Sequence, residues 1–265
     1  MGHGKLRKFA ENETFRCLVQ PSSEDVIVSK EGGLVLKDHP LKGHWNSVMF
    51  DAPRPIVLEL GCGRGEYTID LSAREPENNY IGVDIKGARL WKGAKYATSE
   101  GLGNVAFLRT RIEFIQSFFA PGEVSGIWLT FSDPQMGSEN SRLTSPCFLE
   151  RYRSFLAPGG VVNLKTDSLF LYQYTKAVAE ANGLEILNST EDLYGGPRTA
   201  DPAIYEVQTY SEKMFLRMGL TIKFLSFRID KDGPYVKPDF DAAAWKALEG
   251  PRRTFNHNPA KNTVQ

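Results

Sequence analysis

The feature that most constrains the fold of this 265-residue chain is an apolar run, Ile56–Leu60, that leads directly into closely spaced glycines. Gly61, Gly63 and Gly65 are followed by an amphipathic stretch at residues 66–74. Because glycine tolerates positive φ and lets a ligand approach the backbone, this pattern predicts a strand, a ligand-binding turn and a helix. In open α/β sheets such turns lie at the carboxyl ends of the strands, where ligands bind.

Short apolar runs alternate with amphipathic stretches along the rest of the chain. The expected strands are 56–60, 80–85, 105–108, 126–131, 160–165, 184–188 and 221–228, and the expected helices are 66–74, 88–100, 112–119, 146–155, 169–182 and 210–218. Strands that alternate with helices of this length imply parallel pairing through right-handed crossovers. We therefore expect a Rossmann-like α/β fold, a doubly wound and mostly parallel seven-stranded sheet with an antiparallel last strand.

Proline and glycine mark the expected boundaries. Residues 1–53 are polar and interrupted by prolines, so we expect an N-terminal arm with one short strand at 25–28. Residues 54–228 form the α/β domain. Residues 229–265 contain four prolines and are expected to form an extended C-terminal segment.

Composition excludes several classes of protein. Lys and Arg number 32 and so do Asp and Glu, so bulk charge does not indicate a nucleic-acid partner. The three cysteines, Cys17, Cys62 and Cys147, are far apart and the four histidines are scattered, so we expect no metal site and no disulfide framework. We find neither a secretory signal nor an apolar run long enough to cross a bilayer, so we expect a cytoplasmic protein.

Two acidic residues bear on which ligand the glycine turn accepts. Glu59 interrupts the apolar run, and an unpaired buried carboxylate is costly, so a ligand's ammonium or a structural salt bridge must compensate it. Glu66 stands where a dinucleotide-binding loop has its third glycine, and a negative charge at a helix N-terminus repels a pyrophosphate. S-adenosylmethionine, which is cationic and bears an amino acid, therefore fits Gly61 and Gly63 better than a nicotinamide cofactor.

Three further residues are candidate contacts for the nucleoside part of this ligand. Asp84 ends the second strand, about 20 residues beyond the glycines, where an acid accepts hydrogen bonds from ribose hydroxyls. The alternative role for Asp84 is a helix N-cap. Thr110 and Arg111 follow the third strand, where the adenine edge would lie.

Polar residues also follow the later strands. Asp133 precedes Pro134, which biases the aspartate toward an extended backbone at the carboxyl edge of the sheet. Asp167 follows the fifth strand and either faces a substrate or caps the next helix. Thr209 and Glu212 have the spacing of a capping box before an apolar helix.

With these motifs in order, the chain resembles the bacterial tRNA (guanine-N7)-methyltransferase family over roughly residues 5–228. The resemblance rests on residues 58–66 and 82–84, Phe131-Ser132-Asp133-Pro134, Arg142-Leu143-Thr144 with Phe148-Leu149, Lys165-Thr166-Asp167, and Thr209 with Glu212. The glycine turn is common to most methyltransferases, whereas the ordered set of later motifs is far more specific.

The resemblance implies a class I methyltransferase that transfers a methyl group to N7 of a guanosine in the tRNA variable loop. It implies that Glu59, Asp84 and Asp133 contact the cofactor, with Asp133 also the catalytic candidate. Asp167 and the segment Thr209, Tyr210, Ser211 and Glu212 would hold the guanine. The implied partner is tRNA, without membrane or metal, and the implied assembly is a monomer or a homodimer.

The chain departs from the family pattern at residues 135–141, where a basic run is usual and none is present, and at Thr110, where an acid is usual. Lys5, Arg7 and Lys8 near the N-terminus, and Arg252 and Arg253 near the C-terminus, are alternative candidates for phosphate contacts. The competing hypotheses are a methyltransferase of the same fold acting on another RNA or a small molecule, a cofactor-binding protein without catalysis, and an NAD-dependent oxidoreductase.

Overall fold

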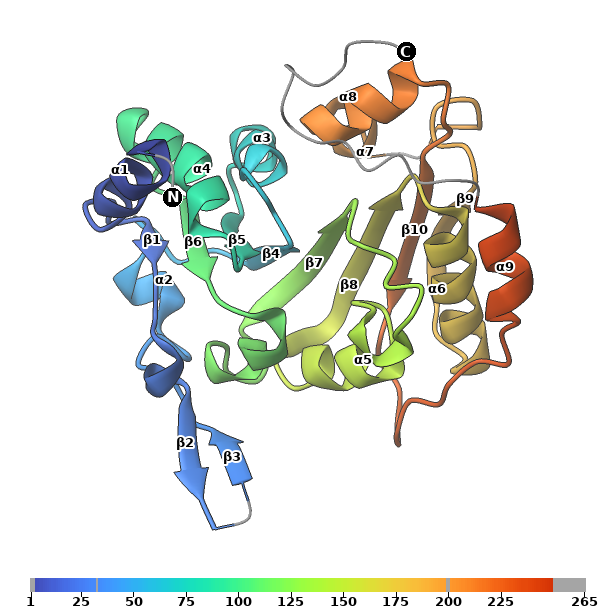
Figure 1. Cartoon of the computed structure of the whole chain (residues 1–265), viewed down its shortest axis with the longest axis horizontal. Helices are drawn as coiled ribbons and strands as arrows, with labels where there is room; N and C mark the ends of the chain where they lie inside the picture. The colour runs from blue at the N-terminus through green and yellow to red at the C-terminus, as the bar shows by residue number, and fades with distance from the viewer. Residues whose placement is uncertain (1–2, 32, 199–200, 250–265) are drawn as a thin grey trace.

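The computed structural model describes residues 3–31, 33–198 and 201–249, and its centre is a twisted sheet (Figure 1). The sheet order is β1-β6-β5-β4-β7-β8-β10-β9. The strands are β1 (Leu18–Val19), β4 (Ile56–Leu60), β5 (Asn79–Asp84), β6 (Val105–Arg109), β7 (Val124–Thr130), β8 (Leu156–Thr166), β9 (Ile186–Thr190) and β10 (Lys223–Arg228). Neighbouring strands run parallel, except that β10 is antiparallel to both β8 and β9.

This topology confirms the expected doubly wound, mostly parallel sheet with an antiparallel last strand. The expected count of seven strands was wrong for the described residues, because β1 adds an eighth strand beside β6. Leu18 and Val19 pair with Phe107 and Leu108. A two-residue strand in a polar segment carries no periodic signal, so only its long-range pairing reveals it.

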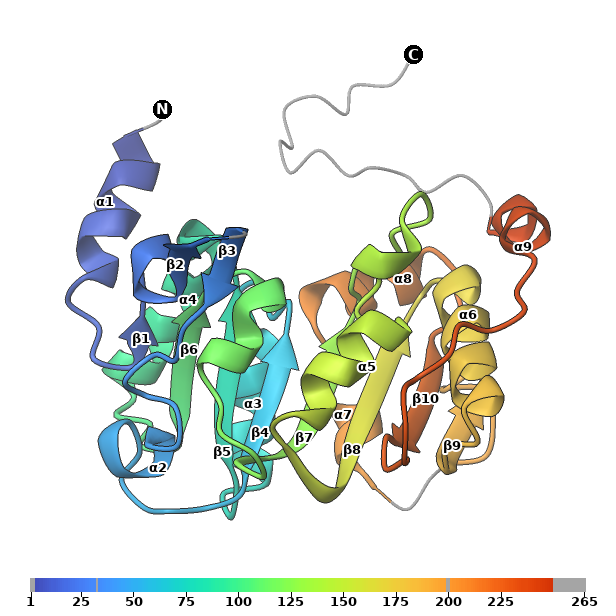
Figure 2. The same ribbon diagram turned by 90° about the horizontal axis from the view of Figure 1, so that it is seen from below.

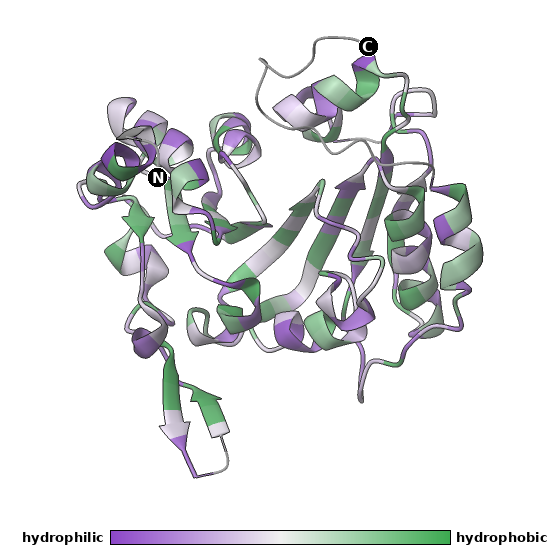
Figure 3. Ribbon diagram, viewed as in Figure 1, coloured by the Kyte–Doolittle hydropathy of each residue, from purple (hydrophilic) through white to green (hydrophobic). Residues whose placement is uncertain are grey.

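Helices cover both faces of the sheet. The main ones are α3 (Glu66–Arg74), α4 (Gly87–Ser99), α5 (Pro146–Arg153), α6 (Leu169–Ala181), α7 (Ala203–Glu206) and α8 (Tyr210–Arg217). The helix expected at 112–119 is a 3-10 helix at Ile112–Ser117. Successive strand residues point to opposite faces. Leu58 therefore packs in one core with residues of α5 and α6, while Val57 packs with residues of α3 and α7. Figure 3 shows that the hydrophobic residues are concentrated in the strands and on the buried sides of the helices.

Apart from one hairpin, the described residues before position 54 pack against the domain. Helix α1 (His3–Asn12) lies against α4, where the Asn12 side chain donates a hydrogen bond to the Gly87 carbonyl oxygen at 3.0 Å. The expected strand at 25–28 is β2 (Ile27–Lys30), which pairs with β3 (Gly33–Leu36) in a hairpin that projects from the body (Figure 1). Helix α2 (Trp45–Val48) buries Trp45 completely in the core.

Residues 229–249, the described part of the expected extended segment, also pack on the domain. The ring of Phe240 meets those of Phe170 and Tyr174 edge-on, with centroids 5.6 and 5.4 Å apart. Helix α9 (Ala242–Leu248) follows and lies beside α6 (Figure 2), capped by the Asp241 side chain. Residues 250–265, with Arg252 and Arg253, lie outside the described residues. None of the helices in the described part of the chain combines the length and apolar character of a membrane span.

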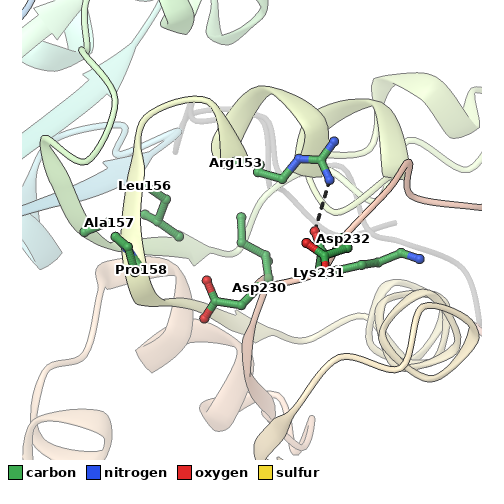
Figure 4. Close-up of a pocket in the computed structure, with 8 residues that line it drawn as sticks. Arg153, Leu156, Ala157, Pro158, Asp230, Lys231 and Asp232 are labelled. Atoms are coloured by element: carbon green, nitrogen blue, oxygen red, sulfur yellow. Dashed lines mark hydrogen bonds between the residues drawn. The ribbon is translucent and has the colours of Figure 1, made fainter.

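A hollow lies where this segment leaves β10, at the edge of the sheet where β8 begins (Figure 4). The Arg153 guanidinium donates to the Lys231 carbonyl oxygen at 3.2 Å, and the Asp230 carboxylate accepts from the Gly159 amide at 3.0 Å. Both charged groups therefore bind backbone atoms, and these two hydrogen bonds join the C-terminal segment to the rest of the domain. It lies at the edge opposite the glycine turn.

Candidate active site

The glycine turn between β4 and α3 separates two cavities at the carboxyl edge of the parallel strands. Gly61 and Gly63 have φ of 82° and 58°, a region that side-chain-bearing residues rarely adopt. Gly61 lines both a cavity of about 410 Å³ and a second of about 440 Å³. The turn predicted from the sequence is therefore the wall that the two cavities share. We call them the Glu59 cavity and the Asp84 cavity after the acid that each contains.

Glu59 is the buried carboxylate of the first cavity, with only 3% of its surface exposed. It accepts hydrogen bonds from the Thr68 amide (2.9 Å), the Thr68 hydroxyl (2.5 Å) and the Thr130 hydroxyl (2.6 Å). Burial raises the pKa of Glu59 to about 7, although the bonds from Thr130 and Thr68 oppose that rise. No cation of the described residues forms a salt bridge with Glu59, so the structural alternative is not found. The carboxylate can still accept a cationic ligand.

Asp84 belongs to the second cavity and is held by two backbone amides. One carboxylate oxygen accepts from the Gly63 amide at 2.9 Å, and the other from the Lys86 amide at 2.7 Å. The residue at the N-cap position of α4 is Lys86, so Asp84 does not take the capping role. Each oxygen keeps capacity for a further hydrogen bond, and the orientation of the carboxylate is fixed.

Thr110 and Arg111 line the same cavity, at the end of β6. Thr110 is buried and Arg111 is exposed. The Arg111 guanidinium lies 3.2 Å from the Glu113 carboxylate. The structure thus places both residues at the Asp84 cavity, as the sequence predicts.

Asp133 faces the Asp84 cavity from a strained loop after β7. Phe131 and Gln135, on either side of it, have φ of 52° and 47°, the two positive values at non-glycine residues among the described residues. Such conformations cost of order 1–3 kcal/mol each and persist only where the surroundings enforce them. The exposed Asp133 carboxylate accepts from the Gln135 amide at 2.9 Å. The structure therefore brings Asp84 and Asp133 to one cavity.

Arg142 holds this loop, a role that sequence reasoning missed. Its side chain is 4% exposed, and its Nε donates to the Pro134 carbonyl oxygen at 3.2 Å. The guanidinium also lies over the rings of Tyr174 and Phe170, 4.3 and 4.8 Å from their centroids. The sequence signal was the motif Arg142-Leu143-Thr144, which does not reveal what the guanidinium contacts.

Lys165, named in the sequence only as part of the motif Lys165-Thr166-Asp167, forms a buried ion pair with Glu212 that the sequence did not predict. Both side chains are fully buried, and the ammonium lies 2.7 Å from the carboxylate. Lys165 also donates to the carbonyl oxygens of Ile204 and Val207, at 2.7 and 3.1 Å, while the Tyr194 hydroxyl donates to Glu212 at 2.6 Å. Burial lowers the pKa of Lys165 and raises that of Glu212, and the attraction between the two charges opposes both shifts. The pair holds α7 and α8 to the end of β8.

The beginning of α8 faces the Glu59 cavity, across from the glycine turn. Thr209, Tyr210 and Ser211 line it. The Thr209 hydroxyl accepts from the Glu212 amide at 3.1 Å, which confirms the predicted N-cap. Glu212 itself is turned toward Lys165 and lines neither cavity.

Asp167 lies just beyond β8, half-buried, and also lines neither of the two cavities. Its carbonyl oxygen accepts from the Lys223 ammonium at 3.0 Å. The N-cap of α6 is Ser168, whose hydroxyl accepts from the Leu171 amide at 3.0 Å, so Asp167 does not take the capping role. Within the described ranges no group of three or more His, Cys, Asp or Glu side chains is arranged to hold a metal ion.

Comparison with known proteins places the chain among methyltransferases. A family model described as a putative methyltransferase matches residues 53–225. A tRNA (guanine-N(7)-)-methyltransferase from Porphyromonas gingivalis is 53% identical over 217 residues, which cover 82% of this chain and 86% of that protein. The protein of the same name from Bacteroides thetaiotaomicron is 45% identical over 258 residues, covering 97% and 96%.

Solved structures share the fold at low sequence identity. The 16S rRNA methyltransferase KamB has a TM-score of 0.51 and 14% identity, covering 80% of this chain and all of that one. The antibiotic-resistance methyltransferase Kmr has a TM-score of 0.50 and 17% identity, covering 78% and 99%. These likenesses establish a class I methyltransferase fold.

Proposed function

This chain belongs to the tRNA (guanine-N7)-methyltransferase family, and from that premise we propose that it transfers a methyl group from S-adenosylmethionine to N7 of a guanosine in the tRNA variable loop. The observation that carries the proposal is the arrangement of three acids around one glycine turn. Glu59 lies in one cavity, and Asp84 and Asp133 lie in the other, with Gly61 between them.

The residues present fit the cofactor from end to end. Glu59 is a buried carboxylate without a cationic partner, which suits the ammonium of the amino-acid end. Asp84 presents two fixed oxygens to the ribose hydroxyls, and Thr110 and Arg111 would meet the adenine. Gly61 lines both cavities, so its backbone would lie against a ligand that extends from one to the other. When bound, S-adenosylmethionine supplies an electrophilic methyl group.

Methylation at guanine N7 requires little acid–base chemistry. N7 already carries an in-plane lone pair, so no proton must leave before attack, and the protein mainly has to orient the base. Asp133 is the candidate catalytic residue, because an acid beside the cofactor can accept hydrogen bonds from the guanine and stabilise the positive charge that develops on it. Arg142 keeps the Asp133 loop in its strained conformation.

The guanine-binding side consists of Asp167 and the beginning of α8. Thr209, Tyr210 and Ser211 face the cavity and would contact the nucleotide directly. The Oε1 of Glu212 is engaged by Lys165 and Tyr194, whereas its buried Oε2 has no hydrogen-bond partner among the described residues and would be the atom that accepts from the base. Asp167 follows β8, whose last residues pair with the end of β7, so it lies at the edge of the sheet where the Asp133 loop begins.

The test is to incubate the protein with labelled S-adenosylmethionine and unmodified tRNA and to identify the methylated nucleoside by mass spectrometry. We expect N7-methylguanosine from the wild type and at least a hundredfold less from Asp133→Ala, since one well-placed transition-state contact contributes about that factor. If the tRNA is labelled but the methylated nucleoside is not N7-methylguanosine, the proposed position of methylation is rejected. If the tRNA carries no label, tRNA is rejected as the substrate. The absence of basic residues at 135–141 favours a different RNA as the second candidate, and 16S rRNA is the substrate to try next.

A further inference from the structure

Four cations from different parts of the chain line the Glu59 cavity. Lys8 comes from α1, Arg64 from the glycine turn, and Arg89 and Lys92 from α4. Lys92 is paired with Glu66 at 2.9 Å. In the described part of the chain Lys8, Arg64 and Arg89 form no ion pair. We call these three residues the basic rim.

Besides Glu59, which lines the same cavity, the acids beside the basic rim are Glu66 and Glu11, and both are engaged by other groups. Glu66 accepts from Lys92 and from the Tyr210 amide at 2.9 Å. Glu11 accepts from the Trp91 indole at 2.6 Å, and both Arg7 and Lys95 lie 3.5 Å from its carboxylate. Arg64 also attracts the Glu66 carboxylate, but the hydrogen bonds of Glu66 are to Lys92 and Tyr210, so the three cations of the rim keep hydrogen-bonding capacity for an anion.

Aromatic rings alternate with these cations. Trp91 lies beneath Lys8, whose ammonium is 4.5 Å from the ring centroid. Tyr210 is 55% exposed, and the Arg64 guanidinium lies 5.9 Å from its ring. A neighbouring hollow shares Arg64 and Tyr210 and adds Tyr96, which is 49% exposed. Cations interleaved with exposed rings are typical of surfaces that bind single-stranded nucleic acid, through phosphate contacts and base stacking.

The position of the rim relative to the active site is fixed by the fold. Helix α1 lies beside α4, and α8 lies above the ends of β7 and β8 (Figures 1 and 2). The rim and the beginning of α8 line the same cavity. On the other side of the glycine turn, the loop at residues 135–141 contains no basic residue.

We propose that the basic rim is the surface that binds the phosphates of the tRNA nucleotides next to the target guanosine. This inference rests on the proposed function and adds a location, namely that RNA is held on the α1–α4 side of the cavity. It also distinguishes the N-terminal cations from one another. Lys8 lines the cavity, whereas Arg7 is paired with Glu11 and Lys5 lies over the Phe9 ring at 5.9 Å.

The test is the affinity for unmodified tRNA, measured without cofactor by filter binding between ~50 and ~300 mM salt. The variant combines Lys8→Ala, Arg64→Ala and Arg89→Ala. Its control removes the same charge elsewhere through Lys30→Ala, Lys37→Ala and Lys246→Ala, at exposed residues of the hairpin, the chain beyond it and α9. We expect the rim variant to bind at least about tenfold more weakly at ~100 mM salt, with a salt slope shallower by about two to three. The control should bind like the wild type.

A second variant, Lys8→Arg with Arg64→Lys and Arg89→Lys, keeps the positive charges and should retain most of the affinity for tRNA. This result would show that the alanine variant binds weakly because it lost charge and not because it misfolds. Unchanged affinity in the alanine variant, or an equal loss in the control, would overturn the proposal. The proposed function fails separately, if wild-type protein leaves tRNA unmethylated. If the wild type forms N7-methylguanosine while the rim variant binds tRNA normally, the rim alone is rejected.

Discussion

Glu59 and Glu212 are both buried carboxylates, yet their surroundings differ. Glu59 has two hydroxyls and one amide around it, lines a cavity, and has a pKa raised to about 7. Glu212 has the Lys165 ammonium at 2.7 Å and lines neither cavity of the site. The fold places a cation beside Glu212 but leaves its Oε2 without a hydrogen-bond partner among the described residues, whereas Glu59 has hydrogen bonds to both oxygens and no cation. A buried acid without a cation is a candidate to bind a cationic ligand, whereas a paired one stabilises a contact within the fold.

The largest expected effect is at the paired acid. Lys165→Met should lower the free energy of unfolding by about 3–5 kcal/mol, because it leaves the Glu212 carboxylate buried without its cation. Urea denaturation at pH 7.5 measures this. The double variant Lys165→Met with Glu212→Gln removes both charges and should recover much of the loss. If the single and double variants were equally unstable, the ion pair would not be what holds α8 in place.

Glu59→Gln should have the opposite effect on stability. The pKa of Glu59 is raised from 4.5 to about 7 in the folded chain, so the folded state retains a proton that the unfolded state loses between these values. The contribution of Glu59 to stability is therefore present at low pH and declines as pH rises through about 7. That difference corresponds to roughly 3 kcal/mol, so Glu59→Gln should stabilise the chain by up to about that much at pH 8.

Denaturation at pH 4 is the matched control for Glu59→Gln, since the carboxyl is largely neutral there in both the folded and the unfolded chain and the two proteins should differ little. A variant less stable than the wild type at pH 8 would show that the ionised carboxylate is already compensated within the fold.

Asp84→Ala should weaken binding of S-adenosylhomocysteine by about 1.5–3 kcal/mol, the range for hydrogen bonds to a charged group. Calorimetry measures this directly. Asp84 also accepts from the Gly63 and Lys86 amides, so Asp84→Asn serves as the comparison that keeps an acceptor for the turn. An affinity unchanged in Asp84→Ala would remove Asp84 from the ribose site.

The smallest effect is expected at the start of α8. Thr209→Ala should lower stability by about 1 kcal/mol through loss of the N-cap, whereas Thr209→Ser should be close to neutral. Thermal denaturation distinguishes the two. A loss comparable to that of Lys165→Met would mean that the cap, and not the ion pair, fixes α8.

Local patterns predicted the cofactor side well. The bounds of β4 and α3 agree with the predicted residues, because a strand, a glycine turn and an amphipathic helix each leave a local signal. Asp84 and Asp133 were placed at the strand ends for the same reason. The capping residue Thr209 was also predicted from spacing alone.

Contacts between distant parts of the chain were not predictable in the same way. Lys165 was visible in the sequence, but its partner Glu212 depends on where α8 docks on the sheet. Strand β1 is defined only by its pairing with β6, and the contact of Lys8 with the cavity depends on α1 lying against α4. These features follow from tertiary packing, which leaves no periodic pattern in one segment.

The most direct test of the difference between the two acids is the pH dependence of cofactor binding. The affinity for S-adenosylhomocysteine, which carries the ammonium, would be measured by calorimetry at pH 6 and pH 8 in wild type and Glu59→Gln. Methylthioadenosine, which lacks the amino acid, is the control ligand. With a Glu59 pKa of about 7, we predict binding up to about tenfold tighter at pH 8 for the wild type, and no such change for Glu59→Gln or the control ligand. Equal wild-type affinities at the two pH values would contradict the assignment of Glu59 to the ammonium.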